Sequence, residues 1–181
     1  MKILDLGCGS FKTAGATGVD VAALPEVDIV HDLNSFPYPV PSDSYDVIIL
    51  RHVVEHLNDI VGLMSEVHRI GKPGAEVRIV TPHFTSSMSY NDPTHRHHFS
   101  LLTFDFFCGG TAHMHVPNAS FKVSRRQVRL WRLNDKWSFH PYAMFGLSTF
   151  IENHPVLYER FFCFLFPIPE FETHLEIIKS R

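Results

Sequence analysis

Cysteine is scarce in this chain of 181 residues, and its three copies do not form a disulfide framework. Cys8, Cys108 and Cys163 are odd in number, lie far apart and lack the paired spacing of a metal site. Small secreted domains usually carry paired cysteines, so this pattern argues against that class. We therefore expect a reduced, cytoplasmic compartment.

Long apolar runs and an excess of one charge are also absent. The longest apolar run, residues 161–166, is far shorter than the roughly 20 residues that a helix needs to cross a bilayer. Because the first apolar segment begins at residue 3, we expect no signal peptide. The formal net charge of −3 argues against a broad nucleic-acid or anionic-membrane surface. We therefore expect a soluble protein without a transmembrane segment.

Phenylalanine and histidine are abundant instead, with 16 and 13 copies. The phenylalanines supply much of a core, and a chain of this length can bury one as a single domain over residues 1–181. The Phe-rich C-terminal third, with an exposed sheet edge, would also suit a homodimer. The histidines occur in clusters and provide candidates for proton transfer or metal binding.

Short apolar runs bounded by glycine, proline or aspartate are typical of strands that are buried on both faces of a sheet. Such runs occupy residues 2–6, 17–21, 28–31, 45–50 and 75–81. The periodicity predicts a helix over 57–70, ended by Gly71, and a second helix over 100–108. Further on, extended segments at 121–133 and 174–179 flank a helical or irregular insertion. The order predicts an α/β fold.

The first strand ends in a pattern that suits a nucleoside. Asp5 is followed by Gly7 and Gly9, which let the backbone turn tightly against a ligand. A second acid, Asp20, ends the next strand and is followed by Val21. In open α/β sheets, a glycine loop followed by a strand-end carboxylate holds a nucleoside, because the acid accepts hydrogen bonds from ribose hydroxyls.

This pair resembles the first two motifs of class I S-adenosylmethionine-dependent methyltransferases, in particular the small type-11-like domains. The likeness continues, in the family's order, through residues 31–39, 44–50, 51–57 and 72–80. The resemblance implies a Rossmann-like, mixed seven-stranded sheet that is parallel except for an antiparallel hairpin at its C-terminal edge. Residues 1–85 would form the cofactor-binding half, and residues 86–181 the acceptor side and the hairpin.

The chain departs from the family around the cofactor. Nothing precedes the first strand, so we expect the N-terminal helix that usually covers the cofactor to be missing. Only residues 10–16 separate the glycine turn from the next strand, whereas a parallel crossover normally needs about a dozen residues or more. The usual first helix is therefore expected to be shortened or absent. Phe11 also replaces the third glycine of the motif.

The resemblance implies S-adenosylmethionine as the cofactor. Its methionine end would contact Asp5 and the glycine turn, its ribose Asp20, and its adenine Asp32 with Leu33. The residues expected to bind it are Asp5, Gly7, Cys8, Gly9, Asp20, Val21, Asp32, Leu33, Arg51 and His52. Two alternatives stay open on the residues alone: Asp32 can form a turn instead, and Cys8 can be inert packing.

A methyl transfer needs an acceptor in line with the sulfonium, and a hydroxyl acceptor also needs a base or a metal to remove its proton. His83 and His95 follow the fifth strand, where α/β enzymes place substrate loops, and His52 follows the fourth. We expect these three to act as base or to line the acceptor pocket. His97 and His98 can equally cap a helix or bond a neighbouring carbonyl.

His52, Glu55 and His56 are spaced to share one face at a helix start. They resemble the metal-ligand segment of methyltransferases that act on ubiquinone precursors or on the 3′ end of small RNAs. With His83 or His95 they could hold a divalent metal. The simpler interpretation is that Glu55 caps the helix, so a metal is possible but not favoured.

A basic strip follows late in the chain, at Arg125, Arg126, Arg129 and Arg132. It would suit a phosphate or carboxylate on the substrate, or more simply protect an edge strand by charge.

The sequence thus predicts an S-adenosylmethionine-dependent methyltransferase that acts on an oxygen or nitrogen of a small-molecule or glycan-like acceptor. One alternative is a catalytically degenerate binding or partner subunit, because the first helix is missing. A weaker alternative is a histidine-based metalloprotein unrelated to methyl transfer.

Overall fold

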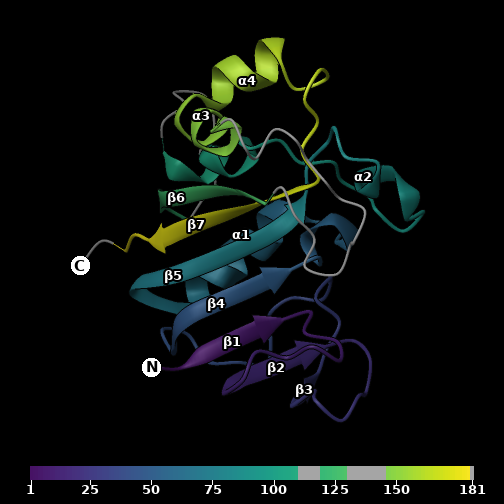
Figure 1. Ribbon diagram of the computed structural model, residues 1–181. Helices are drawn as coiled ribbons and strands as arrows, with labels where there is room; N and C mark the ends of the chain where they lie inside the picture. Colours follow the sequence, from purple (N-terminus) through teal and green to yellow (C-terminus); the bar gives the residue numbers. More distant parts are fainter. Residues whose placement is uncertain (110–118, 130–145, 180–181) are drawn as a thin grey trace.

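A twisted mixed sheet organises the protein (Figure 1). The computed structural model describes residues 1–109, 119–129 and 146–179. Within these residues the sheet has seven strands in the order β3-β2-β1-β4-β5-β7-β6. The strands are β1 (Ile3–Leu6), β2 (Ala16–Asp20), β3 (Ile29–Val30), β4 (Tyr45–Arg51), β5 (Gly71–Pro82), β6 (Phe121–Arg129) and β7 (Glu170–Ile177).

The first five strands are parallel, and the last two reverse direction. β7 lies antiparallel between β5 and β6, with Ile79 opposite Thr173 and Gln127 opposite Glu172. The predicted mixed sheet with an antiparallel C-terminal hairpin is therefore confirmed. β7 begins at Glu170 rather than at the predicted residue 174. The predicted end of the preceding strand, residues 130–133, lies outside the described part of the chain.

Helices are few and short. α1 (Ile60–Ile70) begins later than predicted because the Asp59 side chain caps it, its Oδ1 accepting from the Gly62 amide at 2.8 Å. A 3₁₀ turn, η1 (Val54–His56), precedes it. The predicted helix over 100–108 is a 3₁₀ helix, η2 (Thr103–Cys108), and Gly109 ends it at a φ of 71°. The remaining helices described are α2 (Met88–Asn91), α3 (Leu147–Asn153) and α4 (Pro155–Phe161).

The link between β1 and β2, residues 7–15, contains turns and no helix. This confirms the prediction that the usual first helix is shortened or absent. The turn is held to the sheet by backbone bonds from the Gly7 and Cys8 amides to the Val19 carbonyl, at 2.8 and 3.3 Å. The division of the chain at residue 85 stays a prediction.

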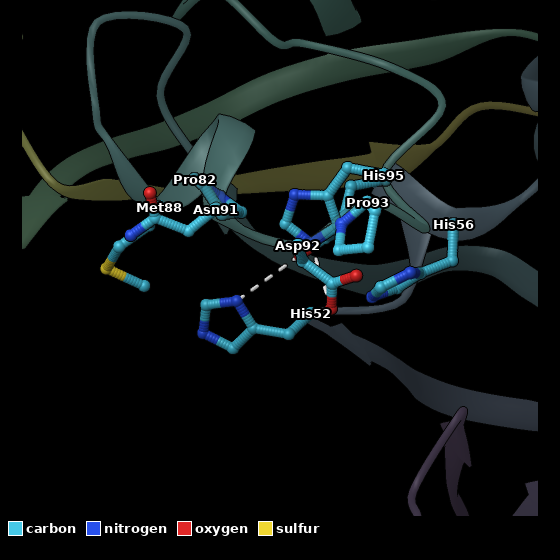
Figure 2. Close-up of a pocket in the computed structure, with 9 residues that line it drawn as sticks. His52, His56, Pro82, Met88, Asn91, Asp92, Pro93 and His95 are labelled. Carbon is cyan, nitrogen blue, oxygen red and sulfur yellow. Dashed lines mark ion pairs between the residues drawn. The ribbon is translucent and has the colours of Figure 1, made fainter.

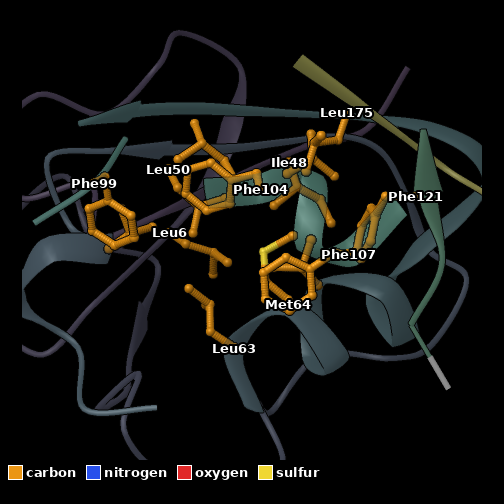
Figure 3. Packing of buried hydrophobic residues seen from close by; sticks show 14 of the residues in the cluster. Leu6, Ile48, Leu50, Leu63, Met64, Phe99, Phe104, Phe107, Phe121 and Leu175 are labelled. Carbon is orange, nitrogen blue, oxygen red and sulfur yellow. The ribbon is translucent and has the colours of Figure 1, made fainter. Parts of the chain in front are cut away.

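One face of the sheet carries the main core (Figure 3). α1 and η2 pack here against inward side chains of the central strands. Phe99 and Phe104 stack with ring centroids 5.5 Å apart, and Phe104 is fully buried. The residues labelled in Figure 3 are Leu6, Ile48, Leu50, Leu63, Met64, Phe99, Phe104, Phe107, Phe121 and Leu175. This packing fixes the strand ends on which the loops of the site are built.

The edge strand β6 is basic, and two of its three arginines are paired with acids. Arg126 contacts Asp105, and Arg129 pairs with Glu172 and, at 3.8 Å, with Glu170. These contacts favour the interpretation of a charged, protected edge strand over an open anion site. Arg132 lies outside the described residues.

A search of the helices in the described ranges found none that is both long enough and apolar enough to cross a membrane.

Candidate active site

The glycine turn after β1 lies against two neighbouring segments. Gly7 has a φ of +70°, and a Cβ built on it would lie 2.4 Å from Cγ2 of Val53. Gly9 has a φ of +49°, and a Cβ there would meet nothing within 4 Å. The turn thus needs glycine at Gly7 for close packing, while Gly9 leaves its backbone open to a ligand.

Asp20 connects this turn to the end of β2. Its Oδ2 accepts from the Gly9 amide and its Oδ1 from the Ala22 amide, both at 2.9 Å. A carboxylate offers about four acceptor positions, so each oxygen keeps one for a further donor. Val21, next along the chain, is 68% exposed. This arrangement fits the predicted role of Asp20 as an acceptor for ribose hydroxyls.

Asp5 is buried, and its Oδ1 has no hydrogen-bond partner. It is 1% exposed, and its Oδ2 accepts from Nη2 of Arg51 at 2.9 Å and from the Thr13 amide at 2.7 Å. The same guanidinium nitrogen donates to the Phe11 carbonyl at 2.8 Å. Asp5 and Arg51 therefore hold the loop over residues 11–13 against β1 and β4, and their contacts with the cofactor stay predictions. Because a buried charge is costly without a partner, the Asp5 carboxylate is paired with the Arg51 guanidinium.

The predicted adenine contacts are also used locally. Oδ1 of Asp32 accepts from the backbone and side-chain amides of Asn34, at 2.9 and 3.0 Å, which forms a turn. The Asn34 backbone bond holds the pKa of Asp32 below its ordinary value. Leu33 is buried in the core at 5% exposure, and its contact with an adenine stays a prediction. Burial raises the pKa of the Cys8 thiol, in keeping with inert packing.

His52 connects β4 to β7. Its backbone has a φ of 51°, unusual for a residue with a side chain. Its Nε2 lies 3.2 Å from Oε2 of Glu170, and its Nδ1 lies 3.4 Å from Oε1 of Glu55. Glu170, and then Glu55, raise the pKa of His52 to about 9. The ring is thus protonated at neutral pH, which does not fit the predicted role as a base. Nothing in the sequence linked Glu170 to this site.

A cavity of about 550 Å³ opens beyond the ends of β4 and β5, beside His52 (Figure 2). Its wall comes from η1, from the end of β5 and from the segment 88–95. The lining residues are His52, Glu55, His56, Pro82, Met88, Asn91, Asp92, Pro93 and His95. The parallel strands of α/β enzymes end where ligands bind, and this cavity lies at that edge.

His95 is one of the predicted catalytic residues, and it lines this cavity. Its Nδ1 lies 3.1 Å from the Ser89 carbonyl oxygen. Because a carbonyl only accepts, we assign the proton to Nδ1, which leaves a lone pair on Nε2. That Nε2 lies 4.0 Å from Oδ2 of Asp92. The His56 ring lies against the His95 ring with centroids 4.6 Å apart.

His83 does not line the cavity, contrary to the prediction. It is fully buried, with Nδ1 2.7 Å from Oγ1 of Thr85 and Nε2 3.2 Å from Oε1 of Glu159. It therefore joins β5 to α4 within the interior. His98 also has a structural contact, since its Nδ1 lies 2.8 Å from Oγ of Ser89. The clusters at His113 and His115 lie outside the described residues.

The predicted metal set is brought together only in part. Glu55 and His56 lie near His95, and one ligand atom of each is within 4.8 Å of the others. His52 is not in this group, because η1 begins after it and its ring turns toward Glu170.

The strand order, the glycine turn after β1 and the acid after β2 define the class I methyltransferase fold. A family model described as a methyltransferase domain matches residues 1–140. The chain therefore belongs to the methyltransferase-domain family, whose class I members use S-adenosylmethionine as cofactor.

A protein of Mycolicibacterium smegmatis, described as a probable S-adenosylmethionine-dependent methyltransferase, is 39% identical over 61 residues. The match covers 34% of this chain and 23% of that protein, so the matched segment spans less than a quarter of that relative's length.

Solved structures share the fold at low identity. A SAM-dependent methyltransferase from Archaeoglobus fulgidus has a TM-score of 0.59 and 19% identity, over 97% of this chain and 85% of that one. The YcgJ protein of Bacillus subtilis has a TM-score of 0.60 and 16% identity, over 99% and 92%. A putative methyltransferase of Haloferax volcanii, solved with the Trm112 methyltransferase activator, has a TM-score of 0.59 and 15% identity, over 98% and 83%.

Proposed function

We propose that this protein transfers a methyl group from S-adenosylmethionine to an oxygen or nitrogen of a small-molecule or glycan-like acceptor. One observation carries the proposal: the glycine turn with Asp20 and the cavity beside His95 open at the same edge of the sheet. β1 and β5 both pair with β4, so the strand ends that carry the two features are close neighbours. A cofactor and an acceptor can therefore meet between them.

The residues present fit the cofactor. Asp20 keeps acceptor capacity for ribose hydroxyls, and Gly9 leaves space over its backbone. When bound, S-adenosylmethionine supplies an activated methyl group. The protein aligns the acceptor and takes up its proton. Among the cavity residues, His95 donates from Nδ1 to the Ser89 carbonyl, so Nε2 is the nitrogen that would take up the acceptor's proton, whereas Glu170 and Glu55 raise the pKa of His52 to about 9.

Calorimetric titration with S-adenosylhomocysteine tests the cofactor site. Asp20→Asn should weaken binding by about tenfold or more, because charge-assisted hydrogen bonds to the ribose are lost. Glu26→Gln is the matched control, since it removes one exposed acidic charge from the neighbouring loop and should leave the affinity unchanged. The absence of binding to folded wild-type protein at millimolar ligand would contradict the proposal.

Turnover is tested with labelled S-adenosylmethionine and a panel of hydroxyl and amine acceptors, including sugars. His95→Gln should lower turnover while the affinity for S-adenosylhomocysteine stays the same. The link between β1 and β2, which contains no helix, supports a second candidate, a binding or partner subunit without turnover. Cofactor binding without methylation across the panel would support that candidate.

Location and assembly follow from weaker signals. All three cysteines are free thiols, which supports a cytoplasmic location. A homodimer stays a prediction, and its candidate surface is the exposed apolar group Val156, Phe161, Phe164 and Leu165. Light scattering at several protein concentrations tests it.

A further inference from the structure

We propose that Glu55, His56 and His95 form a binding site for a divalent transition metal ion in the wall of the cavity. One ligand atom of each lies within 4.8 Å of the others. Two imidazoles and one carboxylate suit Zn²⁺ well and also accept Mn²⁺ or Co²⁺. Ligand atoms around a four-coordinate zinc lie roughly 3.4 Å apart, given bonds near 2.1 Å. Small side-chain movements would therefore complete the site.

In both histidines Nδ1 already has a partner in the protein, and this contact orients the ring. Nδ1 of His95 bonds the Ser89 carbonyl at 3.1 Å, and Nδ1 of His56 lies 2.9 Å from Oγ1 of Thr94. Histidines that bind metals usually have this kind of partner, which fixes the tautomer and the ring orientation. Nε2 is thus the nitrogen that each ring has available for a metal.

Glu55 gives an independent indication of a ligand. The residue is 1% exposed, and its Oε2 accepts from Oγ1 of Thr81 at 3.1 Å. Its Oε1 is buried and accepts no hydrogen bond, although it forms an ion pair with Nδ1 of His52 at 3.4 Å. A buried carboxylate oxygen without a hydrogen bond is unfavourable even beside a charged imidazole. A metal ion at this position would satisfy the oxygen.

The backbone holds the two halves of the site together. The Glu55 carbonyl accepts from the Arg96 amide at 2.7 Å and from the His97 amide at 3.3 Å. The turn that carries Glu55 and His56 is therefore tied directly to the segment that carries His95. Such a rigid connection keeps the three ligands near one another without a bound ion.

Further coordination positions would face the cavity. Oδ2 of Asp92 lies 4.0 Å from Nε2 of His95 and is a candidate fourth ligand. Any position that Asp92 does not take would be open to water or to an oxygen of a bound molecule. With an ion present, His95 acts as a ligand and no longer as a base.

Metal titration of the metal-free full chain, purified without a polyhistidine tag, tests the site. Calorimetry with ZnCl₂, and separately with MnCl₂, should show one ion bound per chain for at least one of the two metals. His95→Gln and His56→Gln should each weaken binding at least about tenfold. His68→Gln is the control, because His68 lies on α1 and its Nε2 contacts the Ile178 carbonyl. It should bind as the wild type does.

Circular dichroism of the same samples shows whether each variant is folded, and titration with S-adenosylhomocysteine shows whether its cofactor site is intact. His95→Gln should keep its fold and its affinity for S-adenosylhomocysteine. If His56→Gln does not fold, His95→Gln decides alone. Co²⁺ added to the wild type should give the visible absorption of a four- or five-coordinate site. The metal site is overturned if folded wild type binds neither Zn²⁺ nor Mn²⁺, or if folded His95→Gln binds the metal as tightly as wild type does. Neither result would contradict the proposed methyl transfer.

Discussion

Single residues control how closely the turn after β1 approaches the loop after β4. Gly7 combines a positive φ with a close contact to Val53, whereas Gly15 has a φ of +76° and open space where its Cβ would be. Both glycines have a positive φ, but only at Gly7 would a side chain clash with a neighbouring residue. They therefore allow the two effects to be measured separately.

Gly7→Ala should lower the free energy of unfolding by about 2–4 kcal/mol, because it adds a clash to the strained backbone. Gly15→Ala should cost only about 1 kcal/mol, since only the backbone is affected. Urea unfolding followed by circular dichroism measures both. Equal losses in the two variants would show that the contact with Val53 relaxes freely.

At Asp20 the local hydrogen bonding agrees with the sequence pattern, while its contact with a ribose stays a prediction. Asp20 has the partners that a strand-end acid after a glycine turn should have. The grouping of histidines was predicted less well, because the spacing of His52, Glu55 and His56 assumed a regular helix. The chain instead turns at His52 and continues in a 3₁₀ turn, so His95, 39 positions after His56 and already one of the two candidate further ligands, lies near Glu55 and His56 in place of His52. The partner Glu170 comes from a distant strand, which no local pattern reveals.

Among the elements, α1 does two things: it covers the sheet and it fixes the loop over residues 36–40. Glu66 accepts from the Tyr38 amide at 2.8 Å and from two nitrogens of Arg69, and Arg69 also donates to the Tyr38 carbonyl at 3.1 Å. Burial opposes ionisation of Glu66, but the bonds from Arg69 and Tyr38 outweigh it. The pKa of Glu66 is therefore below its ordinary value of 4.5.

A depressed carboxyl pKa stabilises the fold above the unfolded pKa, and this contribution is lost as the pH falls through the folded pKa. Glu66→Gln should thus lower the free energy of unfolding by about 1–2 kcal/mol at pH 7. The difference from wild type should shrink at pH values below about 4.5. Urea unfolding at several pH values provides the measurement. A difference that is constant down to pH 3 would rule out the ion pair as its cause.

η2 offers a direct test of core packing. Phe104 is fully buried and stacks on Phe99, whereas Phe106 is only partly buried. Phe104→Ala should lower the free energy of unfolding by about 3–5 kcal/mol, and Phe106→Ala by clearly less. Thermal and urea unfolding check the ranking. A larger loss at Phe106 would mean that η2 packs by its other face.

Element positions were predicted best where the strands are buried and parallel, as in β1 and β4. Their apolar runs end at glycine, aspartate or a turn, which marks the boundaries. β7 was placed too late in the chain because Glu170, Glu172 and His174 alternate along one face and lower its apolar signal. β5 begins at Gly71 because its first residue pairs with Tyr45 across a register shift, which a sequence pattern does not show.

At the scale of the whole molecule, the rate at which the three thiols are labelled measures whether the chain is folded. Burial raises the pKa of Cys8, Cys108 and Cys163, and Cys108 is the most exposed of the three. Because the thiolate is the reactive form, the native protein should label slowly at pH 7, with Cys108 reacting first. Labelling in urea should be fast for all three. A fast native reaction at Cys163 would show local opening near α4.

The order of the sheet has a consequence for how the chain folds during synthesis. Within the described residues, β6 pairs only with β7, although β7 is made some forty residues later and lies between β6 and β5. The nascent chain must therefore keep β6 without a sheet neighbour until β7 has left the ribosome. The first strands meet no such delay, because β1 and β2 are joined by a short turn. The half of the sheet that carries the glycine turn can thus form while the other half still waits for its last strand.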